Sequence, residues 1–218
     1  MQIELSHVTK RLGKNTVLDD VTMSMSPGRV YGLWGINGSG KTMLMRVIAG
    51  LIYPTSGEIR IDGKVLGRDA AFPESMGLLL ESPAFLDSYT GFENLKLLSE
   101  IKREIDDAQI FQAMHCVGLD AQDTRRYRKY SLGMKQRLGI AAAIMERPRL
   151  VLLDEPTNSL DEAAVGMLAP IIRDMRGDGA LIVVSSHDKE FLYAVSDAVY
   201  HIRAGRNEGC IYEKREET

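Results

Sequence analysis

The sequence predicts an α/β fold in which a mostly parallel sheet carries a phosphate-binding loop at one edge. Residues 35–42 read Gly-Ile-Asn-Gly-Ser-Gly-Lys-Thr, which fits G-x-x-x-x-G-K-[ST]. An apolar strand pattern precedes this loop, and a helical pattern follows it. Two continuous apolar runs, 150–153 and 180–184, are typical of strands that are covered on both faces. Because strands and helices alternate along the chain, a doubly wound sheet is expected.

Composition sets limits on the function. The chain has 218 residues, 44% of them hydrophobic, which suits one compact domain. The formal net charge of −3 argues against a dedicated nucleic-acid binder. No apolar run approaches the ~20 residues that span a bilayer, and no signal-peptide pattern opens the chain. We therefore expect a cytosolic protein. The two cysteines, Cys116 in a helical pattern and Cys210 in a strand pattern, are expected to be reduced and packed.

The first sixty-seven residues are strand-rich. The elements expected there are a half-buried strand at 21–26, a strand at 29–34, a helix at 42–51 and a strand at 58–61. Pro27-Gly28 is a turn, and Asp62-Gly63 marks a hairpin.

The middle of the chain, from Glu81 to about Tyr130, has a helical texture. It contains helical spacing at 92–102 and a second helix that Asp106 or Asp107 caps and Gly118 ends. Ser131 then caps a long helix to about residue 146. The remaining expected elements are the strand at 150–153, a helix at 162–175 with Pro170 as a possible kink, the strand at 180–184, a helix at 189–196 and a hairpin at 199–213.

The loop at 35–42 predicts nucleotide binding. Glycines let its backbone N–H groups turn inward, and these groups together with the helix N-terminus hold phosphate oxygens. Lys41 is expected to reach the outer phosphates, and the Thr42 hydroxyl is expected to ligate Mg²⁺. The residues assigned to phosphate binding are Gly35, Asn37, Gly38, Ser39, Gly40, Lys41 and Thr42.

Three polar side chains follow buried strands at the sheet edge that receives the loop. Asp154 is placed to hold Mg²⁺, and Glu155 to act as general base toward the attacking water. His187 is placed to hydrogen-bond an oxygen of the γ-phosphate. The alternative is that the two acids cap a strand in solvent and that the histidine only packs there.

Ser131-Leu132-Gly133 opens a helix, so its N–H groups and hydroxyl form a possible second anion site. Because the chain already has one phosphate loop, a second site suggests the nucleotide of a partner chain. The alternative is an ordinary serine-capped helix.

With these motifs in order, the sequence resembles the ATP-binding subunit of an ABC transporter over nearly its whole length. Residues 35–42 resemble Walker A, and 150–155 resemble Walker B with its catalytic Glu155. Ser159-Leu160-Asp161 resembles the D-loop, and residues 130–136 resemble the signature motif. The form Tyr-Ser-Leu-Gly-Met-Lys-Gln-Arg, with Glu-Ser-Pro-Ala-Phe at 81–85, resembles the bacitracin and lantibiotic export or immunity subgroup.

The resemblance implies a fold and a set of partners. The fold is a P-loop NTPase core with a mostly parallel sheet, an N-terminal antiparallel β subdomain and a helical subdomain, roughly 82–148, within one domain of 1–218. The activity is ATP hydrolysis with Mg²⁺ by Lys41, Glu155 and His187. The partners are a membrane permease and a second ATPase subunit, homo- or heteromeric, at the inner face of the cell membrane; nucleic acid is not expected.

Two positions depart from the family pattern. Glu81 stands where the family has glutamine, and it is expected to bind Mg²⁺ or water. Leu12 stands where the family stacks an aromatic ring on adenine, which should weaken nucleotide binding by about 1 kcal/mol. Thr9 and Val17 are assigned to the nucleotide site beside Leu12.

The sequence favours an ATPase that drives a permease, an exporter of peptide antibiotics or related compounds. One alternative is a low-activity regulatory ABC subunit, motivated by Leu12, Glu81 and the unusual signature. Another is a soluble, non-transport ABC ATPase, although the chain has neither a coiled-coil insert nor tandem cassettes.

Overall fold

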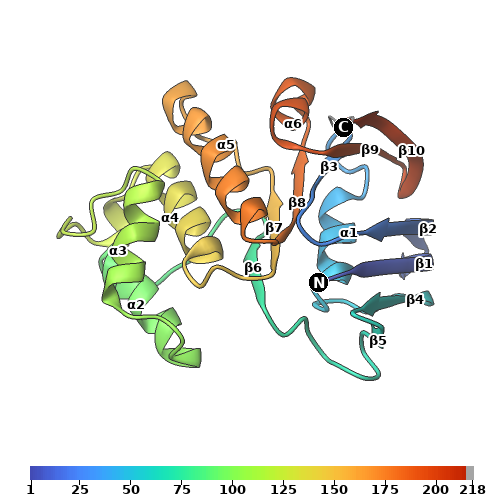
Figure 1. Ribbon diagram of the computed structural model, residues 1–218, viewed down its shortest axis with the longest axis horizontal. Helices are drawn as coiled ribbons and strands as arrows, with labels where there is room; N and C mark the ends of the chain where they lie inside the picture. The colour runs from blue at the N-terminus through green and yellow to red at the C-terminus, as the bar shows by residue number, and fades with distance from the viewer. Residues whose placement is uncertain (215–218) are drawn as a thin grey trace.

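The computed structural model describes residues 1–214 and is built around two β-sheets (Figure 1). The larger sheet has six strands in the order β10-β9-β3-β8-β7-β6. Their bounds are β3 Val30–Trp34, β6 Met76–Leu79, β7 Leu150–Asp154, β8 Leu181–Ser186, β9 Ala198–Arg203 and β10 Arg206–Glu213. Every neighbouring pair is parallel except β9 and β10, so the expected mostly parallel sheet is confirmed.

The smaller sheet is antiparallel and comes from the N-terminal part of the chain. Its order is β2-β1-β4-β5, with β1 Ile3–Leu12, β2 Asn15–Met25, β4 Ser56–Ile61 and β5 Lys64–Val65. Val21, Met23 and Met25 are buried, as their alternation with polar residues predicts. The hairpin at Asp62-Gly63 is confirmed, and both of its residues take positive φ, at 48° and 79°.

The first helix fills the space between the two sheets, as Figure 1 shows. This helix, α1 (Lys41–Ile48), buries Leu44, Met45, Val47 and Ile48 against both sheets. It ends before the expected residue 51 because Gly50 takes a left-handed φ of 75° just beyond its last turn.

Alternate residues of the central strands pack on opposite faces of the larger sheet. Leu150 and Leu152 of β7 belong to the core on the α1 side, whereas Val151 and Leu153 belong to the core beneath the other helices. This arrangement explains why β7 reads as a continuous apolar run.

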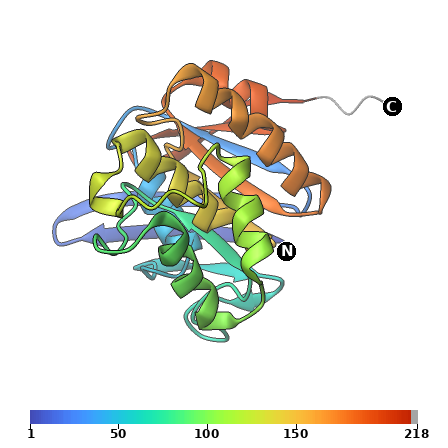
Figure 2. The same cartoon turned by 90° about the vertical axis from the view of Figure 1, so that its left-hand side faces the viewer.

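Five further helices cover the other face of this sheet and one of its ends. They are α2 Gly91–Lys102, α3 Asp107–Cys116, α4 Leu132–Ile144, α5 Glu162–Gly177 and α6 Lys189–Val195. Figure 2 shows α2, α3 and α4 grouped on one side of the molecule, in front of the strands. Asp106, rather than Asp107, caps α3 in a capping box with Gln109, and Ser131 caps α4.

Three sequence expectations are answered by this part of the structure. Pro170 lies inside α5, which continues through it to Gly177. Cys116 and Cys210 are free thiols as expected, but the prediction that they are packed is wrong, since both are exposed. Within residues 1–214, no helix combines the length and the apolarity that crossing a bilayer requires.

Candidate nucleotide-binding site

The predicted phosphate loop connects the end of β3 to the start of α1. Gly40 precedes the helix with a φ of 109°, and a Cβ atom there would lie 3.0 Å from the carbonyl oxygen of Val17. A Cβ atom at Gly35 would lie 2.3 Å from the carbonyl oxygen of Ile202. Backbone conformation and close packing therefore both require glycine in this loop.

A pocket of about 550 Å³ opens over the loop. Its lining residues are Thr16, Val17, Asn37, Gly38, Ser39, Gly40, Lys41, Thr42, Met43, Arg46, Glu81, Glu155, Ala204 and Gly205. The pocket thus brings together nine residues that the sequence singled out. Sequence reasoning missed Thr16, Met43, Arg46 and the turn at Ala204-Gly205. Gly205 donates its N–H to the Ser39 carbonyl at 2.8 Å, a contact between distant segments that no local pattern announces.

Lys41 is buried in the wall of this pocket, with 5% of its side chain exposed. Its Nζ donates to the carbonyl oxygens of Gly35 at 2.7 Å and Ile36 at 3.3 Å. The same nitrogen lies 3.3 Å from Oε1 of Glu155. The loop therefore holds the ammonium group at the place where phosphate oxygens would meet the loop amides.

Thr42 and Asp154 form the second polar pair of the site. The Thr42 hydroxyl donates to Oδ2 of Asp154 at 2.6 Å. Asp154 is buried at the end of β7, and its other oxygen accepts a hydrogen bond from the Ser185 hydroxyl. A hydroxyl and a carboxylate oxygen are ligands of the kind that Mg²⁺ prefers. The side chains present therefore fit this cation.

Glu155 connects the buried part of the site to its mouth. Its backbone takes a φ of 47°, which is uncommon for a residue with a side chain. Oε2 lies 2.9 Å from Nδ1 of His187, which is 59% exposed. Oε1 is buried, lies 3.3 Å from Nζ of Lys41 and accepts no hydrogen bond from residues 1–214.

Glu81 lines the pocket but faces a cation. Its carboxylate forms an ion pair with Arg46 at 2.7 Å and is 62% exposed. Among the hydrogen bonds of residues 1–214, none joins Glu81 to Thr42 or Asp154. No local pattern predicts the contact with Arg46, because it joins residues 35 positions apart.

The three residues assigned near adenine, Thr9, Leu12 and Val17, lie in different places in the structure. Val17 lines the pocket. Leu12 ends β1 opposite Asn15 and is 46% exposed, outside the pocket lining but beside the pair of Arg11 and Thr16. The Thr9 hydroxyl accepts the N–H of Asp20 across the pair of β1 and β2, and Thr9 is not among the residues that line the pocket.

Ser131 and Gly133 lie away from the pocket. The Ser131 hydroxyl accepts the N–H of Met134 at the start of α4. A Cβ atom at Gly133 would lie 2.8 Å from the carbonyl oxygen of Ser159, so the helix start packs against the loop after Glu155. Gln136 strengthens this connection, since its Nε2 donates to the carbonyl of Pro156 at 3.2 Å.

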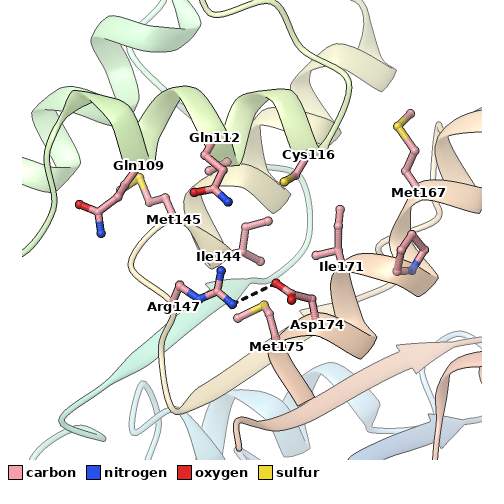
Figure 3. Close-up of a pocket in the computed structure, with 12 residues that line it drawn as sticks. Gln109, Gln112, Cys116, Ile144, Met145, Arg147, Met167, Ile171, Asp174 and Met175 are labelled. Atoms are coloured by element: carbon pink, nitrogen blue, oxygen red, sulfur yellow. Dashed lines mark hydrogen bonds and ion pairs between the residues drawn. The ribbon is translucent and has the colours of Figure 1, made fainter. Parts of the chain in front are cut away.

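A second pocket, of about 350 Å³, lies between α3, α4 and α5 (Figure 3). Its lining residues are Gln109, Gln112, Ala113, Cys116, Ile144, Met145, Arg147, Met167, Pro170, Ile171, Asp174 and Met175. The Arg147 guanidinium at its edge is paired with Asp174 at 3.0 Å. The two pockets share no lining residue.

The chain is similar to proteins that bind ATP for transport. The model of the ABC transporter family matches residues 18–158. An uncharacterized ABC transporter ATP-binding protein of Bacillus subtilis, YybJ, is 44% identical over 97% of this chain and 99% of its own. The bacitracin transport ATP-binding protein BcrA of Enterococcus faecalis is 35% identical, over 90% of this chain and 65% of its own. The lantibiotic transport ATP-binding protein SrtF of Streptococcus pyogenes is 33% identical, over 94% and 88%.

Solved structures agree on the fold. An ATP-binding subunit of an ABC transporter superposes with a TM-score of 0.85 at 25% identity, covering 96% of this chain and 89% of that one. A dimeric ATP-binding cassette in a post-hydrolysis state, bound to ADP and Pi, has a TM-score of 0.87 at 22% identity, covering 98% and 99%. The chain therefore belongs to the ABC transporter family, as an ATP-binding subunit of its ATPase class.

Proposed function

We propose that this chain hydrolyses ATP to drive a separate membrane permease that exports peptide antibiotics or related compounds. The observation that carries the hydrolytic part is the position of Glu155, whose two oxygens face Lys41 and His187 in a pocket above the phosphate loop. The export of peptides is supported by the names of BcrA and SrtF, which describe bacitracin and lantibiotic transport for those proteins.

The side chains divide the work of hydrolysis. Lys41 and the loop amides bind the phosphates and neutralise their charge. Thr42 and Asp154 hold Mg²⁺, which when bound stabilises the charge that develops on the transferred phosphoryl group. Glu155 accepts a proton from a water molecule while the water oxygen attacks the γ-phosphorus. The bond from the γ-phosphorus to the bridging oxygen then breaks, leaving ADP and phosphate. His187 orients Glu155 through Nδ1 and directs Nε2 toward a γ-phosphate oxygen.

A second ATPase subunit completes the proposed site. Ser131 and Gly133 sit outside this chain's own pocket, at the start of a helix whose N–H groups suit an anion. We infer that they contact the nucleotide of a partner, together with Asp161 at the start of α5. The partner is a second copy of this chain or a related subunit.

The proposed arrangement includes the membrane. We treat 1–218 as one ABC ATPase domain, of which residues 215–218 lie outside the described part, with a helical subdomain at roughly 82–148. The permease would hold this domain at the cytoplasmic face of the cell membrane. The conformational change that ATP hydrolysis drives would reach the permease through the segment around Glu81. Nucleic acid is not a proposed partner.

The test is Mg²⁺-dependent ATP hydrolysis by the purified chain beside a Glu155→Gln variant. We expect turnover that falls at least ~100-fold in the variant, because the general base is lost. Glu162→Gln is the matched control, since Glu162 is an exposed acid of α5 outside the pocket. Turnover that persists in E155Q would contradict the assigned base.

A low-activity regulatory subunit is the second candidate. The two residues that depart from the family pattern lie at or beside the pocket. Glu81 pairs with Arg46, and Leu12 provides no aromatic ring for adenine. Such a subunit would bind ATP with negligible turnover alone. Adding the permease in proteoliposomes separates the candidates, because a motor subunit then turns over and a purely regulatory one does not.

A further inference from the structure

Trp34 is the last residue of β3 and immediately precedes the phosphate loop. Its indole Nε1 donates a hydrogen bond to the carbonyl oxygen of His187 at 3.2 Å. The Nζ of Lys189, the first residue of α6, lies 3.7 Å from the centre of the indole ring. The centre of the His201 ring, from β9, lies 4.4 Å from the centre of the Trp34 ring. One side chain thus contacts both ends of the short segment 187–189.

The His187 side chain needs such support from its backbone. The imidazole is 59% exposed, so packing around it does little to select its orientation. Its only side-chain contact of hydrogen-bond length among residues 1–214 is with Glu155. The direction of the ring therefore depends on where the turn between β8 and α6 is held.

The packing of α6 makes β3 the support for this turn. A Cβ atom at Gly32 would lie 2.8 Å from Ser196 Oγ and 3.0 Å from Val199, so the end of α6 and strand β9 lie directly against β3. Figure 1 shows α6 over this part of the sheet. Trp34 extends the same contact to the beginning of α6, where Asp188 caps the helix. Both ends of α6 therefore pack against strand β3.

We propose that Trp34 is a positioning residue for hydrolysis, which holds the segment 187–189 so that the His187 imidazole meets Glu155. This inference rests on the proposed roles of Glu155 and His187. Among the hydrogen bonds of residues 1–214, none joins the Trp34 side chain to the phosphate loop, so its effect should be on the chemical step and not on ATP binding.

The test compares Trp34→Phe with wild type in steady-state ATP hydrolysis. Phenylalanine keeps an aromatic ring beside Lys189 but removes the N–H donor. We expect kcat to fall about fivefold, the effect of one lost hydrogen bond, with KM for ATP unchanged within about twofold. In a His187→Ala background the same substitution should change kcat no further, because the group that it positions is gone.

Tyr31→Phe is the matched control. Tyr31 lies on the same strand, but its hydroxyl accepts the N–H of Ser26 and makes no hydrogen bond to the segment 187–189. This variant should keep its kcat. A kcat loss in W34F that adds fully to that of H187A would show a general structural role and overturn the proposal, as would a W34F enzyme with wild-type kcat.

Nuclear magnetic resonance supplies a readout that does not require hydrolysis. The ring signal of His187, assigned by its disappearance in H187A, should shift in W34F in the direction that it shifts in E155Q, and should stay in place in Y31F. An unmoved His187 signal in W34F overturns the positioning role even if the protein hydrolyses ATP. An inactive wild type with the expected shift would reject the proposed function while retaining the structural link.

Discussion

The ammonium nitrogen of Lys41 and Oε1 of Glu155 lie 3.3 Å apart, although 114 positions separate them in the chain. Both side chains are largely shielded from solvent, at 5% and 15% exposure. The charge that would bind phosphate and the carboxylate that would activate water therefore share one enclosed space. A nucleotide that enters must compete with Glu155 for Lys41, and its own negative charge adds to that of the carboxylate.

This contact predicts that removing the Glu155 charge tightens ATP binding as well as stopping turnover. Glu155→Gln should lower the Kd for ATP by about fivefold or more, because Lys41 is released from a competing carboxylate. Isothermal titration calorimetry with Mg²⁺ present measures this Kd. Size-exclusion chromatography with ATP should show the variant accumulating as a dimer. The Glu162→Gln control should bind as wild type does. An E155Q chain that stays monomeric at saturating ATP would argue against a nucleotide-bridged dimer.

The pair of Thr42 and Asp154 predicts a specific metal requirement. Thr42→Ala removes a proposed Mg²⁺ ligand and should reduce kcat/KM by about 10- to 100-fold while raising the Mg²⁺ concentration needed for half-maximal activity. Thr42→Ser retains the hydroxyl and should remain near wild type. Chelation of Mg²⁺ should abolish hydrolysis in both. Equal Mg²⁺ dependence in the alanine variant and wild type would remove Thr42 from the metal site.

The position of Leu12 predicts a gain of affinity on substitution. Leu12 is half exposed at the end of β1, next to the pair that includes the pocket residue Thr16. Leu12→Tyr supplies a ring of the kind that stacks on adenine, and the Kd for ATP should fall about fivefold, equivalent to about 1 kcal/mol. The Kd for inorganic triphosphate should not change. A gain of affinity for both ATP and inorganic triphosphate would mean that the ring does not contact the base.

The exposed cysteines predict complete reactivity in the folded state. Because Cys116 and Cys210 are both free and exposed, a thiol-specific chromogenic reagent should titrate two thiols per native chain without denaturant. Cys116→Ser and Cys210→Ser should each remove one. A native titration of fewer than two would restore the packed thiols that the sequence suggested.

The helical region predicts a loss of stability at alkaline pH. Burial raises the pKa of the Tyr127 phenol above its usual value near 10, with a smaller contribution from Asp87. Its hydroxyl donates to the carbonyl of Pro83 at 2.6 Å. A raised folded-state pKa means that the stabilisation is complete below pH ~10 and is lost as pH rises through the folded value. Tyr127→Phe should cost about 1 kcal/mol of unfolding free energy at pH 7. Urea unfolding from pH 7 to 11 should show the difference in unfolding free energy between wild type and Tyr127→Phe shrinking. A difference that stays constant over this range would contradict the prediction.

Local patterns in the sequence determined the elements and most of the chemistry. The phosphate loop, the buried strands β7 and β8, the hairpin at Asp62-Gly63 and the caps at Asp106 and Ser131 depend on neighbouring residues alone. Side-chain periodicity, glycine conformations and capping act over a few positions, so they can be read directly. The family resemblance also followed from contiguous motifs.

The tertiary structure decided which of these residues meet. The pairing of Lys41 with Glu155, the Arg46 contact that occupies Glu81, the turn at Ala204-Gly205 in the pocket wall and the support of His187 by Trp34 join segments far apart in sequence. The same holds for Thr9, which residue type alone could not place outside the pocket. Such contacts depend on strand order and on the register of β3 between β8 and β9, which no local pattern encodes.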